Sequence, residues 1–175
     1  MNITAMYFSG TGTTKKVTAA IADELTESKI SQDETVAGEN PGSIKAGIKP
    51  WQRAADIDFT PPAARREIYR FAPDDLVVFG VPVIAGRVPN VLLKFLDTLQ
   101  GGGALAVPVV LYGNRNFDDA LIELRNILQD RGFYAIGAAA FIGEHSFSRI
   151  LAAGRPDSSD MELSRDFARK LAGKI

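Results

Sequence analysis

Short apolar runs alternate along this chain with stretches of helical spacing. The run at 3–8 is rich in β-forming residues and stops at a Gly/Thr turn, which predicts a strand. The run at 76–81 (LVVFGV) is continuously apolar, which is typical of a strand buried on both faces of a parallel sheet. Further strands are predicted at 105–112 and, towards an edge, at 133–142.

Between these runs, apolar residues recur every three or four positions. Asp118 and Asp119 fall in the first turn of one such stretch, where carboxylates favour the helix dipole, and Gly132 ends it. Helices are therefore predicted after Thr13, from about Asn90 to Leu99, from Asp118 to Gly132 and from about Ser158 to Leu171.

Strands that alternate with helices predict an open, doubly wound α/β sandwich of three layers. We expect a five-stranded parallel sheet in the order 2-1-3-4-5. The second strand is expected at about 54–60, where the alternation is poor. The segment 31–53 is rich in Gly, Pro, Ser and charge and is expected to be a long loop or insertion. The length favours a single domain over 1–175.

Charge and composition limit the kinds of partner and of redox site that the chain could have. The formal net charge is −1, which does not favour a nucleic-acid partner. The chain has no cysteine, so it forms no disulfide, thiolate zinc site or cysteine-ligated iron-sulfur cluster. Redox chemistry would need a bound organic cofactor. A basic leader and an apolar run of about 18 residues are both absent, so we expect a cytoplasmic protein without membrane association.

The loop after the first predicted strand has the composition of a phosphate site. Ligands of such sheets bind at the carboxyl ends of the strands, and this loop also precedes a helix N-terminus. It lacks the lysine pattern of a nucleotide P-loop, and Lys15 stands where a dinucleotide fingerprint needs its third glycine. A mononucleotide phosphate fits better, although a plain turn that caps a helix is the alternative. The loop offers hydroxyls and two flexible glycines: Ser9, Gly10, Thr11, Gly12, Thr13 and Thr14.

These residues carry a resemblance to a known family. Segment 7–14 (YFSGTGTT) resembles the phosphate loop that holds flavin mononucleotide (FMN) in flavodoxins, with the pattern [ST]-x-T-G-x-T. Segments 80–89 and 112–119 resemble the flavodoxin half of bacterial flavodoxin-ferredoxin fusion proteins. The resemblance covers most of the chain, and it implies a flavodoxin-like fold with FMN as cofactor.

The resemblance also implies which residues flank the flavin. In that family the two later loops lie on either side of the isoalloxazine ring, so 82–86 would lie along one side and 114–117 along the other. Phe117 would stack on the flavin, or else be the first core residue of its helix. Ile84, an apolar residue in a tight Pro/Gly loop, would either contact the flavin or simply be buried. The later loops add these cofactor candidates: Pro82, Val83, Ile84, Ala85, Gly86, Arg87, Tyr112, Gly113, Asn114, Arg115, Phe117 and Asp119.

Three charged or titratable side chains near these loops have open roles. Arg87 and Arg115 either place positive charge near the reduced flavin or bond to backbone carbonyls at the surface. His145, the only histidine, lies in a GEHSFS loop that resembles one in the fusion family. It is either solvated or structural, or it faces a substrate or partner.

The resemblance implies an FMN-binding electron carrier. The fusion proteins continue into a cysteine-rich ferredoxin domain, whereas this chain has no cysteine to hold a cluster. Its electrons would come from separate redox partner proteins, a reductase or a ferredoxin. The alternatives are an FMN-dependent NAD(P)H:quinone-type oxidoreductase and an FMN-binding sensor module. Monomer and dimer both remain open.

Overall fold

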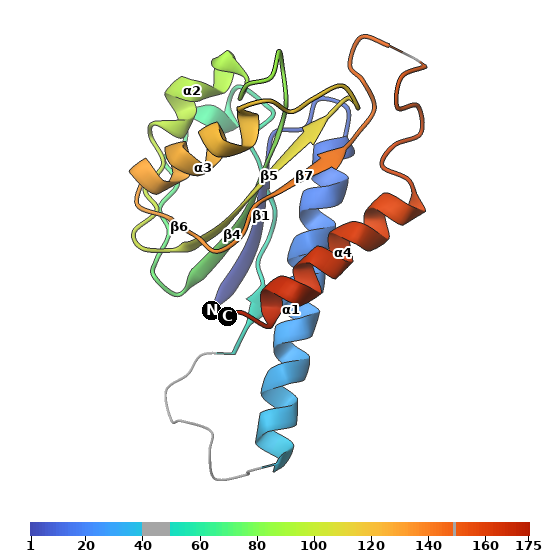
Figure 1. The fold of residues 1–175 in the computed structure, drawn as a ribbon. Helices are drawn as coiled ribbons and strands as arrows, with labels where there is room; N and C mark the ends of the chain where they lie inside the picture. The colour runs from blue at the N-terminus through green and yellow to red at the C-terminus, as the bar shows by residue number, and fades with distance from the viewer. Residues whose placement is uncertain (40–49, 149) are drawn as a thin grey trace.

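The computed structural model describes residues 1–39, 50–148 and 150–175. A central sheet lies between two pairs of helices, with α1 and α4 on one face and α2 and α3 on the other (Figure 1). In chain order the elements are β1 (Asn2–Tyr7), α1 (Thr13–Glu39), β2 (Gln52–Arg53), β3 (Ile57–Asp58), the short 3₁₀ helix η1 (Ala64–Arg66), β4 (Asp75–Pro82), α2 (Asn90–Leu96), β5 (Leu105–Tyr112), α3 (Ala120–Asp130), β6 (Tyr134–Ala135), β7 (Ala139–Ile142) and α4 (Ser158–Ala172).

Every strand pairing in the sheet is parallel. β4 lies between β1 and β5, β2 and β3 both pair with β1, and β6 and β7 both pair with β5. The strand positions therefore follow the predicted order 2-1-3-4-5, which confirms the doubly wound α/β sandwich. Each edge position consists of two short strands. The strand expected at 133–142 is therefore interrupted between β6 and β7, and of the strand expected at 54–60 only Ile57–Asp58 forms, as β3.

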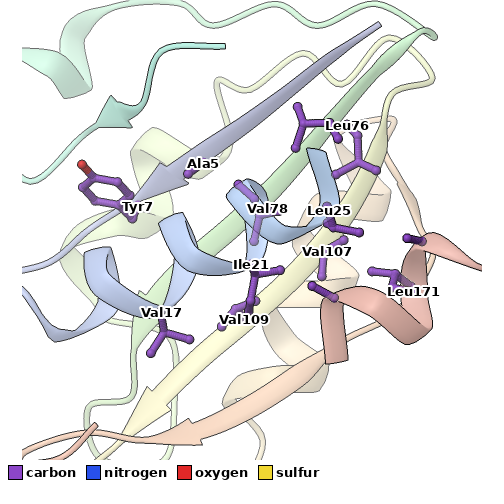
Figure 2. Packing of buried hydrophobic residues seen from close by; sticks show 14 of the residues in the cluster. Ala5, Tyr7, Val17, Ile21, Leu25, Leu76, Val78, Val107, Val109 and Leu171 are labelled. Carbon is purple, nitrogen blue, oxygen red and sulfur yellow. The ribbon is translucent and has the colours of Figure 1, made fainter. Parts of the chain in front are cut away.

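Two apolar layers explain why the central strands are apolar throughout. Along β4, Leu76 and Val78 face α1 and α4, whereas Val77 and Phe79 face α2 and α3. All four side chains are fully buried. Figure 2 shows the first layer, in which Ile21 of α1 lies against the sheet. A strand covered on both faces has no solvent side on which a polar residue is favoured.

The helix α1 corrects the prediction for segment 31–53. Residues 31–39 continue the helix instead of forming a loop, 40–49 lie outside the described residues, and 52–53 form β2. The first helix-breaking residue of the segment is Gly38, and extending an existing helix needs no new nucleation. Neither α1 nor any other helix among the described residues is long and apolar enough to cross a membrane.

Candidate functional site

Loops from four strands converge at the carboxyl edge of the sheet and enclose two adjoining cavities. The smaller, of about 170 Å³, is bounded by the loop after β1 together with 82–84, 111–113, 143–144 and Ser146. The larger, of about 540 Å³, lies between the loops after β4, β5 and β7. Both volumes are lined by a shared set of residues: Val83, Ile84, Tyr112, Gly113 and Ser146. The cavities therefore form one elongated site.

The loop after β1 presents its backbone to the smaller cavity. Gly12 has a φ of 86°, a left-handed conformation that favours glycine. A Cβ added at Gly10 or at Gly12 would meet no atom within 4 Å, so the backbone here is open to a ligand. The hydroxyl oxygens of Thr11 and Thr13 lie 3.2 Å apart, and Thr14, only 2% exposed, also lines the cavity.

The same loop ends at the N-terminus of α1, where several backbone N–H groups have no acceptor among the described residues. Among the described residues, none accepts a hydrogen bond from the N–H groups of 11–14. The first intrahelical bond of this turn is donated by Lys16 N–H to the carbonyl of Gly12, at 3.0 Å. Free N–H groups and the positive end of the helix dipole together favour an anion at this position.

The loop after β4 is a tight hairpin. Ile84 and Arg87 exchange backbone hydrogen bonds of 3.0 and 3.1 Å, and the two residues between them, Ala85 and Gly86, have φ values of 51° and 75°. Positive φ at both central positions is the geometry of a type I′ turn. The turn presents the side chain of Ile84, which is 49% exposed, to both cavities.

The loop after β5 is held by local hydrogen bonds and by close packing. Asn116 Oδ1 accepts a hydrogen bond of 3.1 Å from Asp118 N–H, and Asn114 and Asp118 have φ values of 59° and 42°. Tyr112 lines both cavities and its ring lies 5.4 Å from that of Phe117. Phe117 is itself packed against the core layer of α2 and α3.

The loop after β7 covers one side of the larger cavity. His145 lies against Gly113, where an added Cβ would come within 2.6 Å of its ring. His145 Nδ1 accepts a hydrogen bond of 3.1 Å from Phe147 N–H. Further along the loop, Glu144 Oε1 accepts one of 3.0 Å from Gly154 N–H. This internal bonding keeps the loop in place although the Phe147 side chain is 92% exposed.

Most of the predicted site residues lie together on the two cavities. Those that line a cavity are Gly10, Thr11, Thr13, Thr14, Pro82, Val83, Ile84, Ala85, Gly86, Tyr112, Gly113 and Arg115. Ser9, Gly12 and Asn114 shape the loops without lining either cavity. Whether these residues hold a cofactor stays a prediction.

Three further predicted site residues line neither cavity: Arg87, Asp119 and Phe117. Arg87 makes a two-pronged ion pair with Glu123, with nitrogen to oxygen distances of 2.9 and 2.7 Å, and these hydrogen bonds lower the pKa of the Glu123 carboxyl. Arg87 and Asp119 line a separate groove between α2 and α3. The Arg87 guanidinium is therefore committed to a carboxylate outside the site.

The predicted cofactor-binding residues left out several that line the cavities: Phe8, Leu111, Asn116, Asp118, Gly143, Glu144, His145, Ser146 and Phe147. Of these, Asn116 lies within the loop 114–117 that was expected beside the ring, and His145 was singled out with an open role. Most of the residues left out belong to the loop after the last strand. A general signal places this whole loop at the site, since the carboxyl end of every parallel strand faces the same edge of the sheet.

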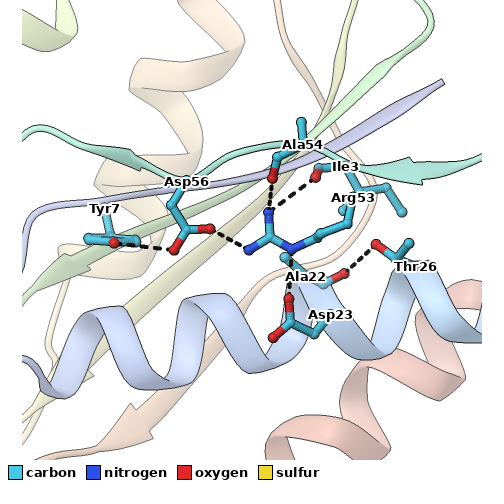
Figure 3. A network of polar contacts seen from close by, with 8 residues as sticks. All are labelled: Ile3, Tyr7, Ala22, Asp23, Thr26, Arg53, Ala54 and Asp56. Atoms are coloured by element: carbon cyan, nitrogen blue, oxygen red, sulfur yellow. Dashed lines mark hydrogen bonds and ion pairs between the residues drawn. The ribbon is translucent and has the colours of Figure 1, made fainter.

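A polar network ties the β2–β3 edge of the sheet to α1 beside this site (Figure 3). Arg53 pairs with Asp23 of α1 at 2.7 Å and with Asp56, and the Tyr7 hydroxyl donates to Asp56 at 3.2 Å. Burial and the nearby charge of Asp56 raise the pKa of Tyr7 to about 12. These side-chain contacts therefore help to hold the β2–β3 edge, where the short strands pair over only two residues each.

Comparisons with known proteins define the fold. No protein-family model matches the chain, and no curated protein matches it. Among solved structures, flavodoxin 1 from Bacillus cereus aligns with a TM-score of 0.60 at 17% identity over 100% of this chain and 99% of its own. An NADH:FMN oxidoreductase in its apo form aligns with a TM-score of 0.61 at 16% identity, over 99% and 89%. The chain therefore has the flavodoxin-like fold.

Proposed function

We propose that this protein binds one FMN in the two adjoining cavities and carries electrons between redox partner proteins. The observation that carries the proposal is the row of backbone N–H groups at 11–14, which donate to no described residue, beside a cavity with apolar and aromatic walls. An anionic group and a flat aromatic group joined by a short chain would match this pair of environments.

The residues present fit FMN at both ends. The phosphate end offers N–H donors at a helix N-terminus, the hydroxyls of Thr11, Thr13 and Thr14, and an open backbone at the two glycines. The ring end offers Ile84 on one loop and Tyr112 on another. The larger cavity, of about 540 Å³, is within the usual range for cofactor sites.

When bound, FMN supplies reversible transfer of one or two electrons. The chain holds and orients it: Thr14 and its neighbours bind the phosphate, and the hairpin at 84–87 and Tyr112 exclude water from the ring. Arg115 is exposed at the larger cavity, so it is the arginine that would place positive charge near the ring. Arg87 would not take that role, because its guanidinium pairs with Glu123.

Exposed apolar side chains at the mouth of the site support a carrier. Ile84 and Phe147 line the larger cavity and are both exposed, as expected where a protein partner approaches a cofactor. The chain has no cysteine to hold an iron-sulfur cluster of its own. Its electrons would therefore come from and go to separate proteins, such as a reductase or a ferredoxin.

One observation favours the alternative, an FMN-dependent NAD(P)H:quinone-type oxidoreductase. His145 lines the larger cavity, and its Nδ1 is already an acceptor for Phe147 N–H. A neutral ring that accepts at Nδ1 carries its proton on Nε2, which is then a donor for a quinone carbonyl. The similarity to the NADH:FMN oxidoreductase is of fold alone.

Anaerobic reduction of the FMN-loaded protein distinguishes these functions. A carrier is expected to take up electrons in two separate one-electron steps, and to be reduced by a partner reductase but not directly by NADH or NADPH. Steady oxidation of either nucleotide in the presence of a quinone would overturn the carrier proposal in favour of the oxidoreductase. A His145→Ala variant would then be expected to lose quinone reduction and to retain FMN.

A further inference from the structure

The segment after β3 makes a direct hydrogen bond to the phosphate loop. The backbone N–H of Ser9, near the start of that loop, donates to Thr60 Oγ1 at 2.8 Å. Thr60 belongs neither to the loop nor to the lining of either cavity. Its hydroxyl therefore acts on the loop from outside the proposed binding site.

Thr60 is itself held from several directions. Its N–H donates to Asp58 Oδ1 at 2.9 Å, and the Arg65 guanidinium donates to the carbonyls of Phe59 and Thr60 at 2.9 and 2.6 Å. Phe59 N–H in turn donates to the carbonyl of Tyr7 at 3.0 Å. The Phe59 ring is fully buried, with its centroid 4.8 Å from that of Phe95. The hydroxyl of Thr60 thus has a fixed position relative to β1.

Ser9 transmits this position to the helix. Its Oγ accepts a hydrogen bond of 3.0 Å from the backbone N–H of Lys15, in the first turn of α1. Ser9 is therefore tied through its backbone to Thr60 and through its side chain to the helix. A hydroxyl that accepts one hydrogen bond still has its own proton to donate, so Ser9 keeps a donor for an anion.

We propose that Thr60 is a positioning residue that fixes the phosphate loop in its anion-binding conformation. This inference rests on the proposed binding of FMN. A loop held in its bound conformation loses less conformational entropy on binding. Without the Thr60 hydroxyl, the N–H of Ser9 has no partner and the loop is no longer held at its first residue. Because Thr60 does not touch the larger cavity, only the phosphate contribution to affinity depends on it.

The test compares FMN with riboflavin, which lacks the phosphate, in titrations of cofactor-free protein. Thr60→Val removes the hydroxyl and is expected to raise the Kd for FMN about 10-fold while changing that for riboflavin less than about twofold. Thr60→Ser keeps the hydroxyl and should stay within about twofold of the native chain for both. Thr26→Val is the matched control, because Thr26 donates to the Ala22 carbonyl at 2.8 Å about 20 Å along α1 from its start.

Two outcomes would overturn the inference. Equal losses of FMN and riboflavin affinity in Thr60→Val would show a general loss of structure, which thermal unfolding of the same variant would report independently. An unchanged FMN affinity would show that the loop needs no support from Thr60. Failure of the native chain to bind FMN at all would instead contradict the proposed function.

Discussion

Thr14 is the most buried hydroxyl side chain of the loop after β1, the proposed phosphate site, and lines the smaller cavity. Thr14→Val keeps the shape of the side chain and removes the hydroxyl. We expect the change to weaken FMN binding by about 1–3 kcal/mol, because a charged phosphate oxygen loses a donor, while riboflavin binding is retained. Isothermal titration calorimetry with both flavins measures the difference. Retained FMN affinity would remove Thr14 from the site.

Gly86 lies at the turn of the β4 loop with a φ of 75°, against the side chain of Asp118. An added Cβ would lie 2.4 Å from Asp118 Oδ2, so Gly86→Ala should lower the free energy of unfolding by about 2–4 kcal/mol. Gly154→Ala is the matched control, because Gly154 has the same φ of 75° and open space around it. Its expected loss, measured by urea unfolding, is about 1 kcal/mol. Equal losses in the two variants would mean that the Asp118 contact contributes nothing.

The raised pKa of Tyr7 makes stability depend on pH in the alkaline range. The folded protein holds this proton more tightly than the unfolded chain, so the contribution is complete below pH 10 and is lost as pH rises through about 12. We expect a loss of about 1–3 kcal/mol from this group. Urea unfolding of the native chain and of Tyr7→Phe over that range isolates it, since the variant keeps every other titrating group. Parallel pH profiles would contradict the assignment.

At the scale of elements, the strands that are buried on both faces were the ones most readily predicted from the sequence. β4 and β5 were predictable because both of their faces are covered, which leaves a continuous apolar run. β3 lies within the strand expected at 54–60, but its bounds and the separate strand β2 were not predictable, because each has two residues and pairs with one neighbour. Arg53 and Asp56 hold this edge through side-chain contacts with Asp23 and Tyr7. Such long-range polar contacts leave no periodic pattern in the sequence.

The site shows the same division. The loops after β1, β4 and β5 could be placed from glycines and hydroxyls at strand ends, which are local signals. The contacts that a single side chain makes could not be predicted in this way. Whether Arg87 faces a cofactor depends on Glu123 in α3, 36 residues away in the chain. Whether Phe117 stacks or packs depends on how α3 docks on the sheet.

Substitutions of Phe117 and of Tyr112 are expected to have different effects on stability and flavin binding. Phe117 is partly buried against the core layer and lines neither cavity, so Phe117→Ala should lower the free energy of unfolding by about 2–3 kcal/mol, less than the loss of a fully buried phenylalanine. Its FMN affinity should change less than about twofold under conditions where the variant stays folded. Tyr112→Ala should instead weaken FMN and riboflavin alike, because Tyr112 lines both cavities. Stronger loss of flavin in Phe117→Ala than in Tyr112→Ala would restore the stacking role to Phe117.

For the whole molecule, the parallel sheet gathers residues that are far apart in the chain. Thr11, Ile84, Tyr112 and Ser146 meet at one edge because each follows or ends a parallel strand. The net charge of −1 provides little long-range attraction for a partner. Recognition of a partner would then rest on the apolar side chains around the site, with a weak dependence on ionic strength.

The most direct test of the account is a titration of the cofactor-free protein with FMN, followed by flavin absorbance and fluorescence. We predict saturation at one FMN per chain, with quenched fluorescence and an affinity at least about 10-fold higher than that for riboflavin, because the phosphate contacts are lost with riboflavin. Absence of saturable binding would contradict the proposed function and leave the flavodoxin-like fold alone. Equal affinity for FMN and riboflavin would contradict the phosphate role of the loop after β1.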